Sequence, residues 1–150
     1  MSRLRTLVGL GLAITLTTAC AGPVSVAEPE VDPETRRICG DIVTDLPRTV
    51  LDAPRRDTTG VISAAWGTPP ITFLCGVPKP AAMATDTRCF EVSGIGWFAQ
   101  EGEGGWLFTT IGRHVTVQLG VPNKYAPEAN ALVEVAAAIE AHDPQHTPCL

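Results

Sequence analysis

Five cysteines carry the clearest chemistry in this chain: Cys20, Cys39, Cys75, Cys89 and Cys149. The last four are dispersed and form no Cys-x-x-Cys pair, the spacing that thiol redox chemistry favours. An even number of dispersed cysteines in an exported protein predicts two structural disulfides. Two pairings fit the chain, and loop-closure entropy does not choose between them. One joins Cys75–Cys89 and Cys39–Cys149, and the other joins Cys39–Cys75 and Cys89–Cys149.

Residues that would indicate a catalytic or metal centre do not occur in a suitable pattern. His142 and His146 are four residues apart, but Pro144 between them breaks the helix that would bring both to one metal ion. Ser63 and Ser93 lie outside any Gly-x-Ser-x-Gly elbow. No pair of carboxylates falls on one strand. The sequence therefore predicts no catalytic residue, no metal and no cofactor, and favours a non-enzymatic role.

Aromatic and basic side chains are the candidates for a binding site. Trp66, Trp97 and Trp106 can line a pocket, although aromatic residues more often fill a core. Arg113 lies at the boundary of an expected strand, where it can hold a carboxylate of the protein or of a ligand. These four residues are the predicted binding residues.

The N-terminal residues have the layout of an export signal. Arg3 and Arg5 precede an apolar run of ten residues, 7–16, which is short for a membrane-spanning helix. Thr-Thr-Ala-Cys, ending at Cys20, resembles a bacterial lipobox, although Thr17 stands where an aliphatic residue is usual. We therefore expect a signal peptide over 1–21 and a lipid anchor on Cys20. The alternative is ordinary cleavage after a small residue and secretion.

The balance of charge argues against a nucleic acid partner. Without Arg3 and Arg5, nine basic and sixteen acidic residues remain, a formal net charge of −7. Binding to nucleic acid rests on clustered lysine and arginine, and Lys79 and Lys124 are the two lysines of the chain. The same acidity argues against adhesion to anionic lipid by charge alone.

The remainder divides into a linker and one domain. Residues 22–32 are rich in proline and acid, which predicts an extended tether. Residues 33–150 are long enough for one core. Asp32-Pro33-Glu34 starts a helix expected over about 33–45, and alanine-rich residues 127–141 predict a second. Between them, 48–57 is interpreted as a loop, and five strands are expected at 58–66, 71–77, 90–98, 106–111 and 115–121.

This order of elements predicts an α+β fold. Strands that follow one another through short turns pair antiparallel. The two helices must then cover the apolar face of the sheet. We therefore expect a two-layer sandwich, in which the N-terminal and the C-terminal helix pack on one face of an antiparallel sheet of about five strands. A small barrel capped by the helices is the alternative.

Several short blocks of the chain follow one another in a recognisable order. They are Ala65-Trp66-Gly67, Pro70, Cys75-Gly76-Val77, Pro80, Gly94, Trp97, Thr109-Thr110-x-Gly112-Arg113, Val115-x-Val117 and Val121-Pro122. In these blocks the chain resembles domain-of-unknown-function family 3515. The similarity covers most of the chain from Cys39 to the second helix, with Leu74 standing where we expect an arginine. The resemblance implies a small exported or membrane-tethered actinobacterial protein of one domain, and it implies no activity.

Together these patterns predict a protein on the outer face of the cell membrane. The first hypothesis is a non-catalytic, lipid-anchored module that binds an envelope protein or a ligand. The second is an enzyme or accessory factor of cell-wall metabolism with a pocket near Arg113. The environment of Arg113 discriminates between them, because an arginine paired inside the protein is not free to hold a ligand.

Overall fold

The computed structural model describes residues 22–83 and 89–148. The expected signal peptide, including Cys20, and the C-terminal Cys149 lie outside these residues. The first helix, α1 (Pro33–Asp45), has the bounds that the sequence predicts. Its N-cap is Asp32, whose carboxylate accepts hydrogen bonds from the backbone N–H groups of Glu34 and Thr35.

Eight strands form one sheet, and every strand pairs antiparallel with its neighbours. The strands are β1 (Thr49–Val50), β2 (Ala53–Arg56), β3 (Ser63–Trp66), β4 (Ile71–Cys75), β5 (Phe90–Val92), β6 (Ile95–Gly102), β7 (Gly105–Ile111) and β8 (Val117–Pro122). A short 3-10 helix, η1 (Asn123–Tyr125), and the second helix, α2 (Asn130–His142), follow them.

The strand order corrects the predicted fold. Along the sheet the order is β1-β2-β3-β4-β8-β7-β6-β5, so two four-stranded meanders meet where β4 pairs with β8. The expected five-stranded sandwich is therefore wrong, because residues 22–83 and 89–148 form a single sheet of eight strands. Two of the extra strands, β1 and β2, lie in the segment interpreted as a loop. A further strand arises because residues 90–98 turn back at Ser93-Gly94, which separates β5 from β6.

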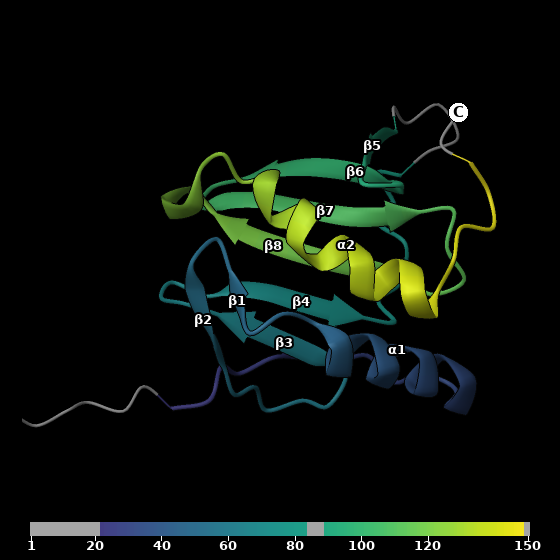
Figure 1. The fold of residues 1–150 in the computed structure, drawn as a ribbon, viewed down its shortest axis with the longest axis horizontal. Coiled ribbons are helices and arrows are strands. Elements are labelled where there is room, and N and C mark those ends of the chain that lie inside the picture. Colours follow the sequence, from purple (N-terminus) through teal and green to yellow (C-terminus); the bar gives the residue numbers. More distant parts are fainter. Residues whose placement is uncertain (1–21, 84–88, 149–150) are drawn as a thin grey trace, which may run out of the picture.

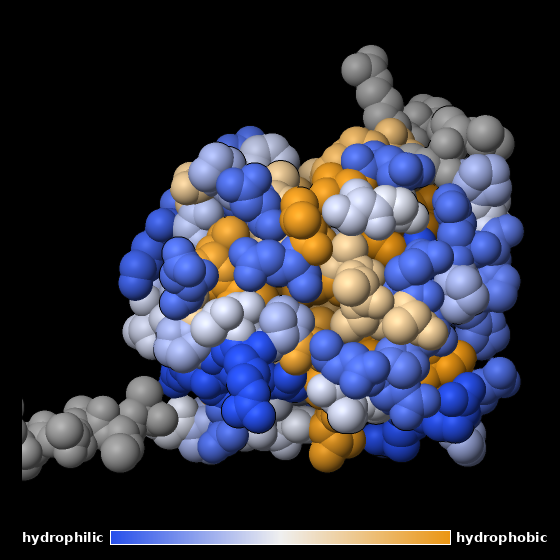
Figure 2. Space-filling view, in the orientation of Figure 1, coloured by the Kyte–Doolittle hydropathy of each residue, from blue (hydrophilic) through white to orange (hydrophobic). Residues whose placement is uncertain are grey.

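Both helices lie on the same face of this sheet (Figure 1). Alternate residues of the two central strands point toward them and are fully or almost fully buried: Ile71, Phe73 and Cys75 on β4, and Val117, Leu119 and Val121 on β8. Figure 2 shows apolar residues over α2 among polar ones on this face, where Val133 is 54% exposed. No helix of the described residues is long and apolar enough to cross a bilayer.

A disulfide joins Cys39 on α1 to Cys75 at the end of β4. This bond belongs to the second of the two pairings left open by the sequence, and it excludes a Cys75–Cys89 bond. Cys89 is disulfide-bonded as well. The first disulfide ties α1 to a central strand, so it closes the core at the edge of the helical layer.

Candidate functional site

Arg113 follows β7 and is built into the interior of the protein. Its Nη1 donates a hydrogen bond to the backbone oxygen of Asp143 at 2.6 Å and lies 2.6 Å from a carboxylate oxygen of Glu140. Its Nη2 donates to the backbone oxygen of Gly94 at 2.8 Å. The side chain of Arg113 is 1% exposed. The guanidinium therefore connects the β5–β6 turn to the end of α2, and it presents no surface to a ligand.

Two of the three tryptophans are core residues. Trp66 on β3 and Trp97 on β6 are both 0% exposed. The indole N–H of Trp66 donates to the backbone oxygen of Pro47 at 3.0 Å. Trp97 stands opposite Thr110 in the sheet. The structure does not bring the four sequence-predicted residues into one site, and Trp106 is the one that remains accessible.

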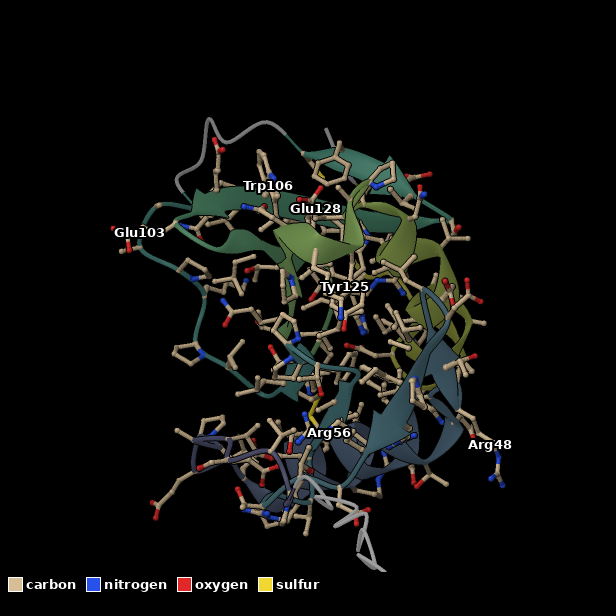
Figure 3. All side chains as sticks on the ribbon, turned by 90° about the vertical axis from the view of Figure 1, so that its left-hand side faces the viewer. Arg48, Arg56, Glu103, Trp106, Tyr125 and Glu128 are labelled. Atoms are coloured by element: carbon tan, nitrogen blue, oxygen red, sulfur yellow. A yellow bond between two sulfur atoms is a disulfide. The ribbon has the colours of Figure 1, made fainter. Side chains whose placement is uncertain are left out.

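Trp106 is the second residue of β7 and is partly buried. It pairs in register with Glu101 on β6 and with Val121 on β8. Its indole ring stacks on the ring of Phe108, with 6.2 Å between the ring centroids and 15° between the ring planes. This stack fixes the orientation of the indole at the end of the sheet, close to Glu128 (Figure 3).

A hollow of about 420 Å³ lies at the β6–β7 hairpin, and Trp106 is one of the residues that line it. Glycines make the space, because Gly102, Gly104 and Gly105 of the β6–β7 hairpin and Gly120 of β8 carry no side chain to fill it. A Cβ on Gly105 would collide with the backbone oxygen of Val121, so this close approach of the strands requires glycine. The other lining residues are Pro70, Thr72, Gln100, Glu101, Trp106, Leu107, Val121 and Pro122.

A second hollow, of about 270 Å³, lies between Trp106 and the start of α2. Its walls are Trp106, Phe108, Pro127, Glu128 and Ala129. Apart from Glu128 these walls are apolar. Pro127 and Ala129 precede α2, so the connection from η1 to α2 forms one side of the hollow and the stacked rings form the other.

The charge around Trp106 is negative. The one charged residue that lines the larger hollow is Glu101, and the one that lines the smaller hollow is Glu128. An aromatic face attracts cations through its quadrupole, and a nearby carboxylate strengthens the attraction. The Trp106 site, defined as Trp106 with these two hollows, therefore has the chemistry to hold an ammonium or guanidinium group on an apolar stem.

The described residues contain no constellation typical of catalysis or metal binding. Ser63 donates a hydrogen bond to the hydroxyl of Thr58 at 3.2 Å, and no histidine takes part in this contact. No group of three or more histidine, cysteine, aspartate and glutamate residues in these parts of the chain could hold a metal ion.

Sequence reasoning identified Trp106 but missed the carboxylates beside it. The segment Glu101-Gly-Glu-Gly-Gly falls between the strands expected at 90–98 and 106–111, and no binding role was predicted for it. The available signal was that this segment carries two acidic residues and directly precedes Trp106 in the sequence. Glu128 is 22 positions away, and only the arrangement of η1 and α2 brings it to the indole.

Comparison with known proteins assigns the chain to a family without adding an activity. No curated protein matches it, and neither does any solved structure. Residues 4–148, nearly the whole chain, match the family described as protein of unknown function (DUF3515). This match confirms the resemblance seen in the Trp-Gly, Cys-Gly-Val and Gly-Arg blocks. The chain belongs to the DUF3515 family.

Proposed function

We propose that this protein is an exported, lipid-anchored module of the cell envelope that binds a partner without catalysing a reaction. Its binding site is the Trp106 site, and the group it holds is cationic. Lipid on Cys20 keeps the protein at the outer face of the membrane. The partner is an envelope protein or ligand that presents a lysine-like or arginine-like group.

The N-terminal sequence and the disulfide support the export half of this proposal. Residues 1–21 combine a basic start, a short apolar run and a lipobox-like ending at Cys20. The Cys39–Cys75 disulfide is of a kind that persists in oxidising compartments outside the cytoplasm.

One observation carries the binding half. Trp106 is a partly buried tryptophan that lines two hollows, and the charged residues that line them, Glu101 and Glu128, are both carboxylates. It differs in this from Trp66 and Trp97, which are fully buried. The arrangement suits a cation with an apolar stem because the stem meets the rings and the charge meets the carboxylates.

The alternative is a cell-wall enzyme with a pocket at Arg113, and it loses the residue that was expected to hold the ligand. Arg113 is paired with Glu140 and with two backbone carbonyl oxygens, and it lines none of the hollows described above. No observation in the described residues favours this alternative over a binding role.

Nuclear magnetic resonance of the full chain in detergent tests the binding site directly. The probe is the peptide acetyl-Gly-Lys-Gly-amide, and its neutral counterpart carries norleucine in place of lysine. We expect the indole N–H signal of Trp106 to shift with the lysine peptide and to shift much less with the norleucine peptide. Equal shifts with both peptides would show that the site does not select charge.

Matched variants assign the effect to the carboxylate. Glu128→Gln should weaken binding of the lysine peptide by about five- to tenfold, because it removes a charge worth roughly 1 kcal/mol at a partly exposed aromatic site. Glu103→Gln is the control. Glu103 lies on the same β6–β7 hairpin as Trp106 but lines neither hollow (Figure 3). An equal loss in both variants would mean that general acidity, not this site, attracts the peptide.

Metabolic labelling with palmitate tests the anchor separately. The wild-type chain should take up label and fractionate with membranes, and Cys20→Ala should do neither. Equal labelling of the two chains would overturn lipidation at Cys20 and favour ordinary secretion.

A further inference from the structure

Residues 22–32, expected as a free tether, lie against the domain in the structure. Val24 forms a parallel bridge with Thr58. Its N–H donates to the backbone oxygen of Asp57 at 2.8 Å, and its own oxygen accepts from Thr59 at 3.0 Å. Further along, a carboxylate oxygen of Glu28 accepts the N–H of Ile62 at 2.7 Å. The segment is therefore held to the folded surface at several points, from Val24 to Glu28.

Arg56 fixes the point at which this segment leaves the domain. Its Nη2 donates to the backbone oxygen of Gly22 at 3.0 Å. Its Nη1 donates to the backbone oxygen of Gly67 at 3.0 Å and lies 3.2 Å from the hydroxyl of Thr68. One guanidinium thus joins the first described residue to the β3–β4 turn.

The same turn is held from its other side by η1. Lys124 Nζ donates to the backbone oxygen of Thr68 at 2.5 Å, and the hydroxyl of Tyr125 donates to the backbone oxygen of Pro69 at 2.8 Å. Lys124 Nζ also lies 5.5 Å from the centre of the Tyr125 ring. Thr68, Pro69 and Lys124 are exposed.

Three cations lie around this exit point. We define the exit surface as Arg48, Arg56, Lys124, Tyr125 and the turn Thr68-Pro69. Arg48 is exposed. Figure 3 shows Arg48 and Arg56 in the lower part of the view and Tyr125 between Arg56 and Glu128. Carboxylates are also close in the sequence or in the adjoining hollow, namely Asp45, Asp52, Asp57 and Glu128, so the cations act through local contacts and not through a net positive charge.

We propose that the exit surface rests on the membrane and that its cations contact the phosphate groups of anionic phospholipids. This inference depends on the lipid anchor of the proposed function. Cys20 is two residues from Gly22, so the lipid-bearing residue is at most about 7 Å from the exit surface along the chain. That distance is within one Debye length at physiological ionic strength, about 8 Å, so the charges act without strong screening.

The side chains suit this position. Lysine and arginine near an anionic leaflet are attracted to it, and tyrosine is enriched at the level of the headgroups because its ring is apolar and its hydroxyl polar. The formal net charge of −7 that remains without Arg3 and Arg5 opposes adsorption of the free protein. Once Cys20 holds the chain at the bilayer, the attraction has only to orient the domain, and direct contacts of a few cations with lipid phosphates are enough.

Photo-crosslinking in membranes tests the orientation. The full chain is exported with a benzophenone amino acid at Asn123, which is exposed in η1 beside Lys124, or at Ala141, which is exposed in the last turn of α2. Membrane phospholipids carry radioactive phosphate. We expect labelled lipid to attach to the Asn123 variant at least about fivefold more than to the Ala141 variant. Equal labelling, or more at Ala141, would overturn the proposal.

Charge variants complete the test. In the Asn123 background, Lys124→Gln should reduce lipid attachment by roughly fivefold, the effect of one lysine near an anionic surface. Lys79→Gln removes the same charge beyond the opposite end of β4 and should leave attachment unchanged. An equal loss in both variants would contradict a specific exit surface.

Fractionation separates this inference from the anchor on which it rests. A chain found in the soluble extract, not in membranes, would defeat the lipid anchor and this inference with it. A chain in membranes that crosslinks to lipid equally from both positions would defeat the orientation alone.

Discussion

Arg113 donates a hydrogen bond to Asp143, and Asp143 in turn accepts hydrogen bonds from the two residues that follow Arg113. Nη1 of Arg113 donates to the backbone oxygen of Asp143 at 2.6 Å. The carboxylate of Asp143, which is 2% exposed, accepts the backbone N–H groups of His114 at 3.1 Å and Val115 at 2.8 Å. The pair therefore locks the β7–β8 connection to the end of α2, and the described geometry gives it a structural role.

Substitution of Asp143 should measure the strength of this lock. Asp143→Ala leaves one buried and one partly buried N–H group without acceptors, so it should lower the free energy of unfolding by about 2–4 kcal/mol. Asp143→Asn keeps one acceptor oxygen and should cost less. Urea unfolding of the full chain, followed by circular dichroism, measures both. A loss below about 0.5 kcal/mol for Asp143→Ala would contradict the lock.

The Cys39–Cys75 bond should stabilise the folded protein mainly by reducing the conformational entropy of the unfolded chain. It closes a loop with a sequence separation of 36. For a loop of this size the chain-entropy model gives about 4 kcal/mol, so the double variant Cys39→Ala, Cys75→Ala should be less stable by about that amount. Calorimetry on the two chains provides the comparison. If their melting temperatures agreed within a degree, the bond would have no stabilising role.

Asp32 should make the stability of the protein depend on pH in the acid range. A hydrogen bond from the Thr35 side chain, and then one from the Thr35 backbone, lowers the pKa of Asp32 below its ordinary value of 3.8. Because the folded pKa is the lower one, the contribution to stability is complete above the unfolded pKa. It is lost as the pH falls through the folded pKa.

Unfolding by urea between about pH 7 and pH 2.5 tests this sign. Asp32→Asn keeps an oxygen for the N-cap but does not titrate, so the stability difference from wild type should shrink on acidification. Thr35→Val removes the largest cause of the shift and should reduce the pH dependence while leaving the carboxylate. A constant difference between wild type and Asp32→Asn across the range would rule out this role.

Gly67 should not tolerate a side chain. It has φ of +69°, and an added Cβ would collide with the Tyr125 hydroxyl and lie 2.8 Å from the Cβ of Ala53. Gly67→Ala should lower the free energy of unfolding by about 1–2 kcal/mol from the left-handed backbone alone. Gly104→Ala is the matched control because nothing lies within 4 Å of its Cβ position, and it should stay within about 0.5 kcal/mol. Equal effects would refute the steric argument.

Helix α1 was predictable because several local signals agree. Asp32 accepts backbone N–H groups, Pro33 fits the first turn, and Ile38 and Ile42 form a buried stripe. The number of strands was not predictable to the same degree. The turn between β1 and β2 uses Leu51 and Asp52, with φ of 50° and 60°, and no glycine marks it.

The β5–β6 turn shows a different limit. Ser93 and Gly94 have φ of 50° and 79° and form a two-residue hairpin turn, whereas the sequence predicted one strand over 90–98. For the candidate site, residue type identified Trp106. Trp66, Trp97 and Arg113 are not available for binding because tertiary packing buries them. The periodicity of short strands that mix polar and apolar residues does not predict that packing.

The two four-stranded meanders depend on each other where β4 pairs with β8. The part with α1 and β1–β4 and the part with β5–β8 and α2 are each continuous in sequence. They meet where β4 pairs with β8, at the two helices, where His142 lies 2.6 Å from Asp45, and where Lys124 and Tyr125 contact the β3–β4 turn. Separated, each part would expose an unpaired central strand. Each part therefore depends on the other to complete the central pairing of β4 with β8.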